Sequence, residues 1–567
     1  MANGAYFFVR RLLAGQDNAE CNQSLISGAR SNLAQGAIKR RGDRIVRWVL
    51  QERLDDGRFR AFVRQKIPVE QPEVHRMGFA GRLLALSSLA VFLIGASSPM
   101  PLRDFVQHMR AASGLPYRYH IISVSRDHAD DVAITRTDLF GLNFLTRVCK
   151  NTICTGTYFD GYRLYAVNLN DTALPNSGAT ERFIRGTRMV NSGAFLAPDF
   201  ERRGGALVDF GNVTEGKYTY RSIGITARDT APTIVWVDPA SYLVFAVRDW
   251  QGHTLFVDND YRRVGPLVLP FTIYQNGAVS QRYETRGIVS APFDAPRGLL
   301  PRFPKTAQPV PMLDARDTPV IPCMIGNVTL RCLLDTGNSG LSVSLEFAEQ
   351  QHLPVIGEYE VRGLGRYATE VVRAGPLNVG GVIFPMANYV VLHDIHRFHY
   401  DAILGADVLA RSTVAIDYGE RTVEFNDGLN NSSGSTVPLA FFNFVPVVPV
   451  HLGDTLAALA IDTGDESTIN LSYDYYSQHP QLFSATATQT VSGVGGSGEE
   501  LIGEIAQVQL GDFRVEALQI GATKSLHATA QGHLGGGFLS HFRVILEYAR
   551  ERLGLSPRSG DSAVKAP

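Results

Sequence analysis

Apolar and polar residues alternate in short runs between residues 99 and 290. A period of two, interrupted by turn residues, is typical of strands that bury one face. Helical periodicity is rare in this part, with Leu102–Ala112 as one instance. The pattern predicts an antiparallel β domain over 99–290. The clearest strand runs are TIVWVDPASYLVFAVRD (233–249), HTLFVDNDY (253–261) and LVLPFTIYQNGAVSQRY (267–283).

Proline and glycine punctuate the next stretch, APFDAPRGLLPRFPKTAQPVP (291–311). Proline has a restricted φ angle and no N–H donor, so this composition suits a linker better than a packed element. We therefore place a domain boundary at 291–311.

An internal repeat follows the linker. Copies of about 110 residues make marginal cores alone, so we expect two lobes, 312–430 and 437–557, to pack as a pseudo-symmetric pair, followed by a tail at 558–567. The first match pairs TPVIPCMIGNVTLRCLLDTGNS (318–339) with FVPVVPVHLGDTLAALAIDTGDE (444–466), which has one extra residue at its start. The later matches are VRGLG (361–365) with VSGVG (491–495) and AILGADVLARSTVAIDY (402–418) with GHLGGGFLSHFRVILEY (532–548).

Each copy carries Asp-Thr-Gly after a hydrophobic strand, at 335–337 and 462–464, and a Leu-Gly pair about 70 residues later. This combination resembles the retropepsin and pepsin clan of aspartic proteases over about 245 residues. The resemblance implies a mainly β fold in which two retropepsin-like lobes form a pepsin-like pseudo-dimer within one chain. It also implies a peptide or protein substrate and a monomeric protein.

The resemblance implies that Asp335 and Asp462 are the catalytic pair. Two carboxylates about 3 Å apart cannot both ionise, so they share one proton. The ionised member would activate a water, and the protonated member would donate to the developing oxyanion. The residues expected to support the two loops, with the threonine hydroxyls tying the loops together, are Thr336, Gly337, Asn338, Thr463, Gly464 and Asp465. The residues expected to thread through them are Leu404, Gly405, Leu534 and Gly535.

Two glycine-rich turns fall where each retropepsin lobe has its substrate-covering hairpin, or flap. Such lids exclude water on closure, and glycine gives them mobility. The alternative is an ordinary surface hairpin. The flap candidates are Gly363, Leu364 and Gly365 in the first copy and Gly493, Val494 and Gly495 in the second.

Several residues depart from the family pattern, which usually has Ala or Ser after Asp-Thr-Gly. Asn338 stands there in the first copy and could hydrogen-bond a carboxylate. Asp465 stands there in the second, and an inward Asp465 would raise the apparent pKa values of the pair. The second copy also has His533 and Gly537 where the first has Ile403 and Asp407. A catalytically inactive protease-fold protein of the cell envelope, binding peptide or lipid, is therefore the alternative to an active endopeptidase.

Other chemistries have weaker signals. His393, His396 and His399 could hold a metal with Asp394 or Asp401, but their place before Ala402 suggests an exposed connection. Neither the HExxH motif nor the GxSxG motif occurs, so no motif supports a metalloprotease or a serine hydrolase. We expect no metal and no cofactor.

The N-terminal strand runs resemble the curved half-barrel of LolA/LolB-type lipoprotein carriers. The runs that carry this resemblance are TGTYFDGYRLYAVNLND (155–171), GALVDFGNVTEG (205–216) and VGPLVLPFTIYQNG (264–277). A curved sheet with an apolar concave face could hold a lipid acyl chain or a peptide. A structural or inhibitory domain that packs on the protease lobes is the alternative.

The apolar run LLALSSLAVFLIGA (83–96) is short for a membrane span but suits a signal-peptide core, with Met77 just ahead of it. We expect 77–98 to direct export to the periplasm or medium, with 1–76 a mis-assigned start or a basic extension. The alternative is that Met1 is the true start and 83–96 is a signal-anchor or a buried helix. The body after residue 98 is mildly acidic, which argues against nucleic-acid binding.

Five cysteines exclude a disulfide-stapled scaffold. Cys149 and Cys154 flank a hairpin-like turn and could bridge in an oxidising compartment or stay reduced. Cys323 and Cys332 lie on one face of a predicted hairpin that turns at Gly326-Asn327. In that register Cys323 faces Leu330, so the two cysteines are only diagonal neighbours at about 7–8 Å, and we expect two unbridged core residues.

Overall fold

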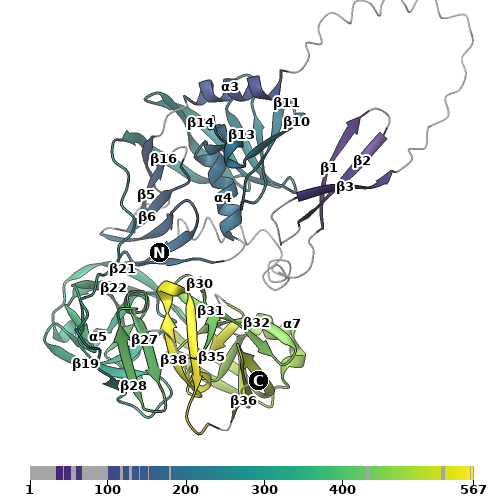
Figure 1. Cartoon of the computed structure of the whole chain (residues 1–567). Helices are drawn as coiled ribbons and strands as arrows, with labels where there is room; N and C mark the ends of the chain where they lie inside the picture. Colours follow the sequence, from purple (N-terminus) through teal and green to yellow (C-terminus); the bar gives the residue numbers. More distant parts are fainter. Residues whose placement is uncertain are drawn as a thin grey trace, which may run out of the picture. The chain divides into compact units, whose positions relative to one another are not determined.

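The structure is a computed structural model, and the mainly β fold predicted from the sequence is confirmed (Figure 1). Contacts divide the chain into two compact units. Unit 1 contains 118–194 and 280–567, and unit 2 contains 23–117 and 195–279. The described residues are 33–41, 44–52, 59–66, 100–114, 119–126, 131–138, 141–150, 152–177, 180–428, 434–524, 530–561 and 563–565.

This division differs from the one drawn on the sequence, where 99–290 form one domain. Residues 118–194 group with the C-terminal half of the chain instead. The expected signal segment, 77–98, lies outside the described residues. Within the described part, no helix is both long and apolar enough to cross a membrane.

Unit 2 is built on an antiparallel meander of six strands, β10 to β15. Between Thr233 and Val237, buried and partly exposed residues alternate, as the period of two predicts, and Val235 and Val237 are fully buried. Helix α3 (Leu102–Ser113) contacts β15 and buries Phe105, Val106 and Met109. The strands are β10 (Ala206–Glu215), β11 (Tyr218–Thr226), β12 (Thr233–Val237), β13 (Val244–Asp249), β14 (Thr254–Val264) and β15 (Leu267–Gln275). A three-stranded sheet precedes them in the chain, with β1 (Leu33–Arg41), β2 (Arg44–Glu52) and β3 (Phe59–Lys66).

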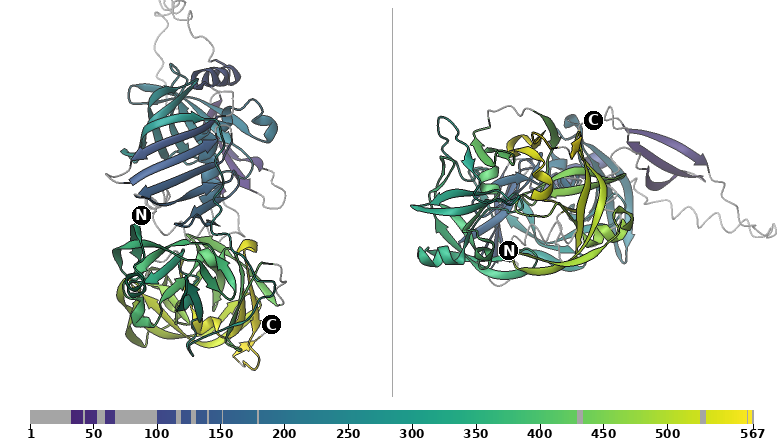
Figure 2. Two further views of the ribbon diagram at one scale, coloured as in Figure 1. Left: turned by 90° about the vertical axis from the view of Figure 1, so that its left-hand side faces the viewer. Right: turned by 90° about the horizontal axis from the view of Figure 1, so that it is seen from below.

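The first part of unit 1 is a second antiparallel array, in which β16 pairs with β4 and the following strands pair in chain order. Figure 2 shows these blue strands side by side. The elements are β4 (His120–Arg126), β5 (Asp131–Asp138), β6 (Phe144–Lys150), β7 (Ile153–Phe159), β8 (Leu164–Val167), β9 (Ala173–Pro175), α4 (Thr180–Asn191) and β16 (Ala278–Val289).

The first repeat forms a nine-stranded sheet in the order β21-β22-β25-β20-β26-β19-β18-β23-β24. Its strands are β18 (Val320–Ile325), β19 (Val328–Leu334), β20 (Leu341–Ser344), β21 (Val355–Arg362), β22 (Arg366–Ala374), β23 (Leu377–Val379), β24 (Val382–Phe384), β25 (Ala387–Leu392) and β26 (Ala402–Leu404). The short helices are α5 (Leu345–Gln350), η3 (Ile395–Phe398) and α6 (Ala406–Leu409).

The second repeat forms a matching sheet in the order β30-β31-β32-β37-β33-β36-β35-β34. Its strands are β30 (Ala440–Phe442), β31 (Val445–Leu452), β32 (Thr455–Ile461), β33 (Ile469–Ser472), β34 (Ala487–Gly493), β35 (Gly496–Leu510), β36 (Phe513–Thr523) and β37 (Gly532–Leu534). The short helices are α7 (Tyr473–Gln478), η4 (Pro480–Leu482) and α8 (Gly536–Leu539). Equivalent serines, Ser344 and Ser472, cap α5 and α7 through their hydroxyl oxygens.

A six-stranded sheet joins the two repeats in the order β17-β28-β27-β38-β39-β29. Its two central strands, β27 and β38, come from equivalent positions of the repeats and run antiparallel. One apolar core runs through both repeats, so each completes the other, as expected for units too small to fold alone. The strands are β17 (Val310–Pro311), β27 (Thr413–Asp417), β28 (Thr422–Asn426), β29 (Ser435–Pro438), β38 (Phe542–Glu547) and β39 (Arg552–Pro557). In the expected tail, β40 (Val564–Lys565) pairs with β36.

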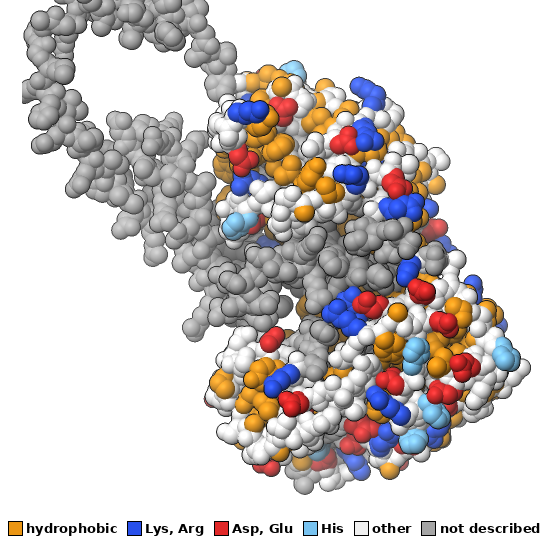
Figure 3. Space-filling view, turned by 180° about the vertical axis from the view of Figure 1, so that it is seen from behind, with side chains coloured by type: hydrophobic (Ala, Val, Ile, Leu, Met, Phe, Trp, Pro, Cys, Tyr) orange, Lys and Arg blue, Asp and Glu red, His pale blue; other side chains and the backbone are white. Residues whose placement is uncertain are grey.

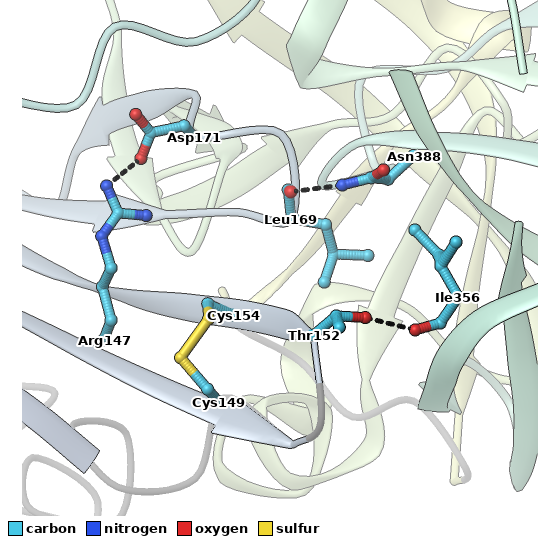
Figure 4. Close-up of a disulfide and its surroundings, with 8 residues drawn as sticks. All are labelled: Arg147, Cys149, Thr152, Cys154, Leu169, Asp171, Ile356 and Asn388. Atoms are coloured by element: carbon cyan, nitrogen blue, oxygen red, sulfur yellow. Dashed lines mark hydrogen bonds and ion pairs between the residues drawn. A yellow bond between two sulfur atoms is a disulfide. The ribbon is translucent and has the colours of Figure 1, made fainter. Parts of the chain in front are cut away.

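The hairpins of residues 144–175 contact the first repeat directly (Figure 4). The Thr152 hydroxyl donates to the Ile356 carbonyl on β21, and the Asn388 amide on β25 donates to the Leu169 carbonyl at 3.0 Å. The disulfide between Cys149 and Cys154, one of the two alternatives, closes the β6–β7 turn beside these contacts.

Cys323 and Cys332 are also joined, so the expectation of two unbridged residues is wrong. The predicted register is confirmed, because Cys323 faces Leu330 and the hairpin turns at Gly326-Asn327. The diagonal Cα atoms are nevertheless 5.9 Å apart, closer than the expected 7–8 Å and within the span of ordinary disulfides. Strand twist brings one diagonal pair of a hairpin closer than a flat ladder does.

Candidate active site

The two Asp-Thr-Gly segments lie at the ends of equivalent strands. Asp335 follows β19, whose last residue Leu334 pairs in parallel with Leu404 of β26. In the second repeat, Ile461 of β32 pairs in the same way with Leu534 of β37 before Asp462. The Asp335 N–H donates to the Leu404 carbonyl at 2.9 Å, and the Asp462 N–H donates to the Leu534 carbonyl at 3.0 Å. The matched sequence frames therefore produce matched backbone positions.

Two threonines lock the loops to each other. The Thr336 hydroxyl donates to the Ile461 carbonyl at 2.6 Å and accepts from the Thr463 N–H at 3.0 Å. The Thr463 hydroxyl makes the reciprocal bonds, to the Leu334 carbonyl at 2.7 Å and from the Thr336 N–H at 3.1 Å. Both side chains are buried, so these four bonds are shielded from water and fix the distance between the two loops.

The Asp335 and Asp462 carboxyl groups lie within hydrogen-bonding reach of each other. Each also accepts from the glycine N–H two residues on, at 2.7 Å from Gly337 and 3.1 Å from Gly464. A Cβ on Gly337 would lie 2.8 Å from Asp462 Oδ2, and one on Gly464 would lie 2.7 Å from the Asp335 carboxyl carbon. Glycine at both positions is thus what lets the two carboxyl groups approach.

The surroundings of the pair act differently on the pKa values of the two carboxyl groups. Burial and the neighbouring Asp462 charge hold the pKa of Asp335 well above its usual value. Burial also raises the pKa of Asp462, but nearby His533 and the hydrogen bond with Asp335 favour its ionised form. Because His533 Nδ1 lies 3.6 Å from Asp462 Oδ2, we infer that the charge of the pair lies on Asp462 and the shared proton on Asp335. The Asp462 side chain is still 18% exposed, so a water molecule can reach it.

His533 lies beside the pair with Asp465. Its Nδ1 atom is 3.6 Å from Asp462 Oδ2 and 3.8 Å from Asp465 Oδ2. Burial alone would lower the pKa of His533, but the neighbouring carboxylates of Asp465 and Asp462 raise it. Burial would raise the pKa of Asp465, but the neighbouring His533 outweighs burial and lowers it. Asp465, the third acidic residue of the site after Asp335 and Asp462, is therefore paired with an imidazolium.

Asn338 does not touch the carboxyl pair through its side chain. Its amide nitrogen donates to the Ser342 hydroxyl at 3.2 Å, and its amide oxygen accepts from the Gly340 N–H at 3.2 Å. The side chain of Asn338 could have bonded a carboxylate, but it shapes the loop instead.

The Leu-Gly pairs pass against the loops as expected. The Gly405 N–H donates to the Gly340 carbonyl at 2.9 Å, and the Gly535 N–H donates to the Thr468 carbonyl at 3.1 Å. A Cβ on Gly405 would lie 2.2 Å from the Asn338 carbonyl, and one on Gly535 would lie 2.2 Å from the Ser467 carbonyl. No larger residue fits at either position without moving a loop.

The two glycine-rich turns are the tips of the β21–β22 and β34–β35 hairpins, and they meet. The Leu364 N–H donates to the Val494 carbonyl at 2.9 Å. A Cβ on Gly365 would lie 1.9 Å from the Gly495 carbonyl, so the close approach of the tips requires glycine there. Val494 packs in one apolar cluster with Leu333 and Ile403, which flank the Asp335 loop. The tips are therefore joined and share packing with the strands that carry Asp335.

The three histidines before β26 lie in two different surroundings. His393 contacts the Thr369 hydroxyl at 3.2 Å, whereas His396 and His399 line a cavity of about 550 Å³. Arginines and acids of that cavity pair with each other, as Arg331 and Arg316 do with Asp314. Over the described residues, no group of three or more His, Cys, Asp and Glu side chains has metal-binding geometry. Figure 3 shows histidine, basic and acidic side chains mixed over the face of the lobes turned to the viewer.

Two tyrosines near the site were not singled out from the sequence. Tyr359 on β21 lies near Ser339, in the loop that follows Asp335, and burial raises its pKa. The Tyr548 hydroxyl is buried, and burial together with both carboxylates of the pair raises its pKa far above the usual value. Tyr548 matches Tyr418 in the repeat, which was a sequence signal for an equivalent buried position.

No protein-family model and no curated protein sequence matches this chain.

Proposed function

We propose that the protein is an aspartic peptidase. The observation that carries the proposal is the Asp335–Asp462 pair, two carboxyl groups within hydrogen-bonding reach at the ends of symmetry-equivalent strands. In particular, we infer a two-lobed, monomeric endopeptidase that cleaves peptide or protein substrates through an activated water.

The inferred proton arrangement assigns the two roles. Ionised Asp462 takes a proton from a water held between the carboxyl groups, and that water attacks the peptide carbonyl carbon. Protonated Asp335 donates to the carbonyl oxygen, which gives a neutral tetrahedral diol. The proton on Asp462 then passes to the amide nitrogen, the C–N bond breaks, and Asp335 recovers its proton from the collapsing diol. The threonine lock keeps the two groups at the separation that this exchange needs.

The joined hairpin tips form the cover over the site where substrate would bind. An extended peptide would lie beneath them, against the strands that end at Asp335 and Asp462. Their contact would open to admit substrate and close to exclude water.

The two disulfides favour export of the protein from the cytosol. The Cys149–Cys154 and Cys323–Cys332 pairs are both bonded, and disulfides persist mainly outside the cytosol. We propose a periplasmic or secreted enzyme. A lipid or acyl ligand for the β-rich N-terminal part stays a prediction from the sequence.

A peptide whose scissile bond is replaced by a statine-type secondary alcohol tests the proposal. Its hydroxyl mimics the tetrahedral intermediate, and we expect tight binding at pH 4–6 with a raised melting temperature. The control peptide has the alcohol replaced by a methylene group and should bind at least about tenfold more weakly, since it loses the hydrogen bonds to both carboxyl groups. Equal binding of the two peptides, or binding of neither, would contradict the proposal.

A further inference from the structure

A buried carboxylate of the first lobe is held by side chains from outside both repeats. Asp407, the second residue of α6, is fully buried. Its oxygens accept from the Asn168 amide at 2.9 Å, the Asn170 amide at 2.6 Å and the Thr172 hydroxyl at 2.5 Å. These three residues belong to the turn between β8 and β9, about 235 residues earlier in the chain.

The same turn reaches the loop of the proposed catalytic residue. The Asn168 amide nitrogen also donates to the Ser339 carbonyl at 2.8 Å, four residues after Asp335. Asp407 is tied to that loop from the other side, because the Ala406 N–H donates to the Asn338 carbonyl at 3.0 Å. The turn, α6 and the Asp335 loop therefore form one hydrogen-bonded unit.

The turn is itself rigid. The Asn168 amide oxygen accepts from the N–H groups of Asn170 and Thr172, both at 3.0 Å. Asn170 is bonded to the backbone of Asn388 on β25 in both directions, at 2.9 Å and 2.8 Å. All three donors to Asp407 are buried, so no water competes for these bonds.

Over the described part of the chain, the second lobe shows no such unit. Gly537 stands where the first lobe has Asp407, and a Cβ there would meet the Thr468 hydroxyl of the same lobe at 2.9 Å. The Asp462 loop is instead accompanied by Asp465 and His533. Among the residues that the structure describes, the Asp335 loop is thus the one that side chains from outside the repeats support.

We propose that the 168–172 turn is a positioning element of the peptidase site, which holds the Asp335 loop in place through Asn168 and through Asp407. The inference rests on the proposed function and assigns part of that function to residues 118–194. That segment is then a component of the catalytic body and not a separable accessory domain. An endopeptidase built from the two repeats alone would lack the partners of a buried carboxylate.

Substitution of Asn168 in the full-length protein tests the inference. Asn168→Ala removes the donors to Ser339 and Asp407, and we expect kcat per active site to fall about tenfold or more, since small misplacements of catalytic groups are costly. KM should change less than about twofold, because Asn168 is buried and offers substrate almost no accessible surface. Active sites are counted by titration with the statine-type peptide, so misfolded protein does not enter the rate.

Thr172 gives a second, milder pair of variants. Thr172→Val loses the hydroxyl donor and should lower kcat per site, whereas Thr172→Ser keeps it and should retain the wild-type value. Ser177→Ala is the control, because Ser177 accepts from the Phe441 N–H at 3.2 Å, away from Asp407 and the Asp335 loop.

Wild-type kcat per titrated site in Asn168→Ala and Thr172→Val would overturn the inference while leaving the peptidase proposal intact. Fewer titratable sites of normal kcat would assign the turn a folding role alone and would also overturn it. A wild-type protein that cleaves no peptide would overturn the proposed function and this inference with it.

Discussion

Asp335→Asn in the full-length protein is expected to reduce peptide cleavage at least about 10³-fold, since the loss of a positioned acid–base group typically costs 10²–10⁴. Asparagine has the shape of the carboxyl group but cannot exchange the shared proton. Asp462→Asn should cost as much, because Asp462 is the group inferred to activate the water. Initial rates on a fluorogenic peptide at pH 3–7 give the comparison.

The stability of the Asp335→Asn variant should not fall with its activity. The pKa of Asp335 is raised by burial and by Asp462, so this group favours folding below its unfolded pKa and loses that contribution as pH rises through the folded pKa. At pH 7, removing it should leave the free energy of unfolding unchanged or increased. Asp417→Asn, which alters a partly exposed pair with Arg543, is the control and should retain activity. Residual activity above about a tenth of wild type in either dyad variant would contradict the assignment.

His533→Ile is expected to shift the acid side of the pH–activity profile upward by about one pH unit or more, as for a carboxylate that loses an opposite charge at about 4 Å. Isoleucine is the residue at the equivalent position, Ile403, so the substitution suits the fold. Without the imidazolium, the pKa of Asp462 rises, and Asp465 loses the partner that offsets its charge. Activity is lost as pH falls through that pKa, so the loss begins at higher pH.

The profile of kcat/KM between pH 2.5 and 7 measures this shift. His533→Ile with Asp465→Ser should show a smaller shift, because the second negative charge is removed with the imidazolium. His541→Gln is the control: His541 pairs with Asp561 at 2.7 Å, and neither residue contacts the dyad loops. An acid limb that stays in place or moves downward in His533→Ile would show that His533 does not tune the pair.

The repeat made much of the structure of the two lobes predictable. The matches that align Asp335 with Asp462 and Leu404 with Leu534 became two parallel strand pairs of the same register. Local patterns sufficed here, because a strand, a tight turn and a glycine that must pass close to a carbonyl each leave a signal of their own in sequence.

Long-range side-chain contacts left no comparable signal. The difference between Asp407 and Gly537 was visible, but nothing in the sequence near Asn168 indicates that its amide would meet Asp407. The Cys323–Cys332 bond was missed because a flat ladder overestimates the distance between diagonal neighbours. His533 was noticed as a departure, yet its pairing with Asp465 depends on the geometry of two loops that meet only in the fold.

Cleavage of a diverse peptide library by the full-length protein across pH 3–7, read by mass spectrometry, tests the central claim most directly. The account predicts cuts at internal peptide bonds over a bell-shaped range of pH, with the products absent in Asp335→Asn and Asp462→Asn. Intact peptides at every pH, or products that persist in both variants, would contradict it.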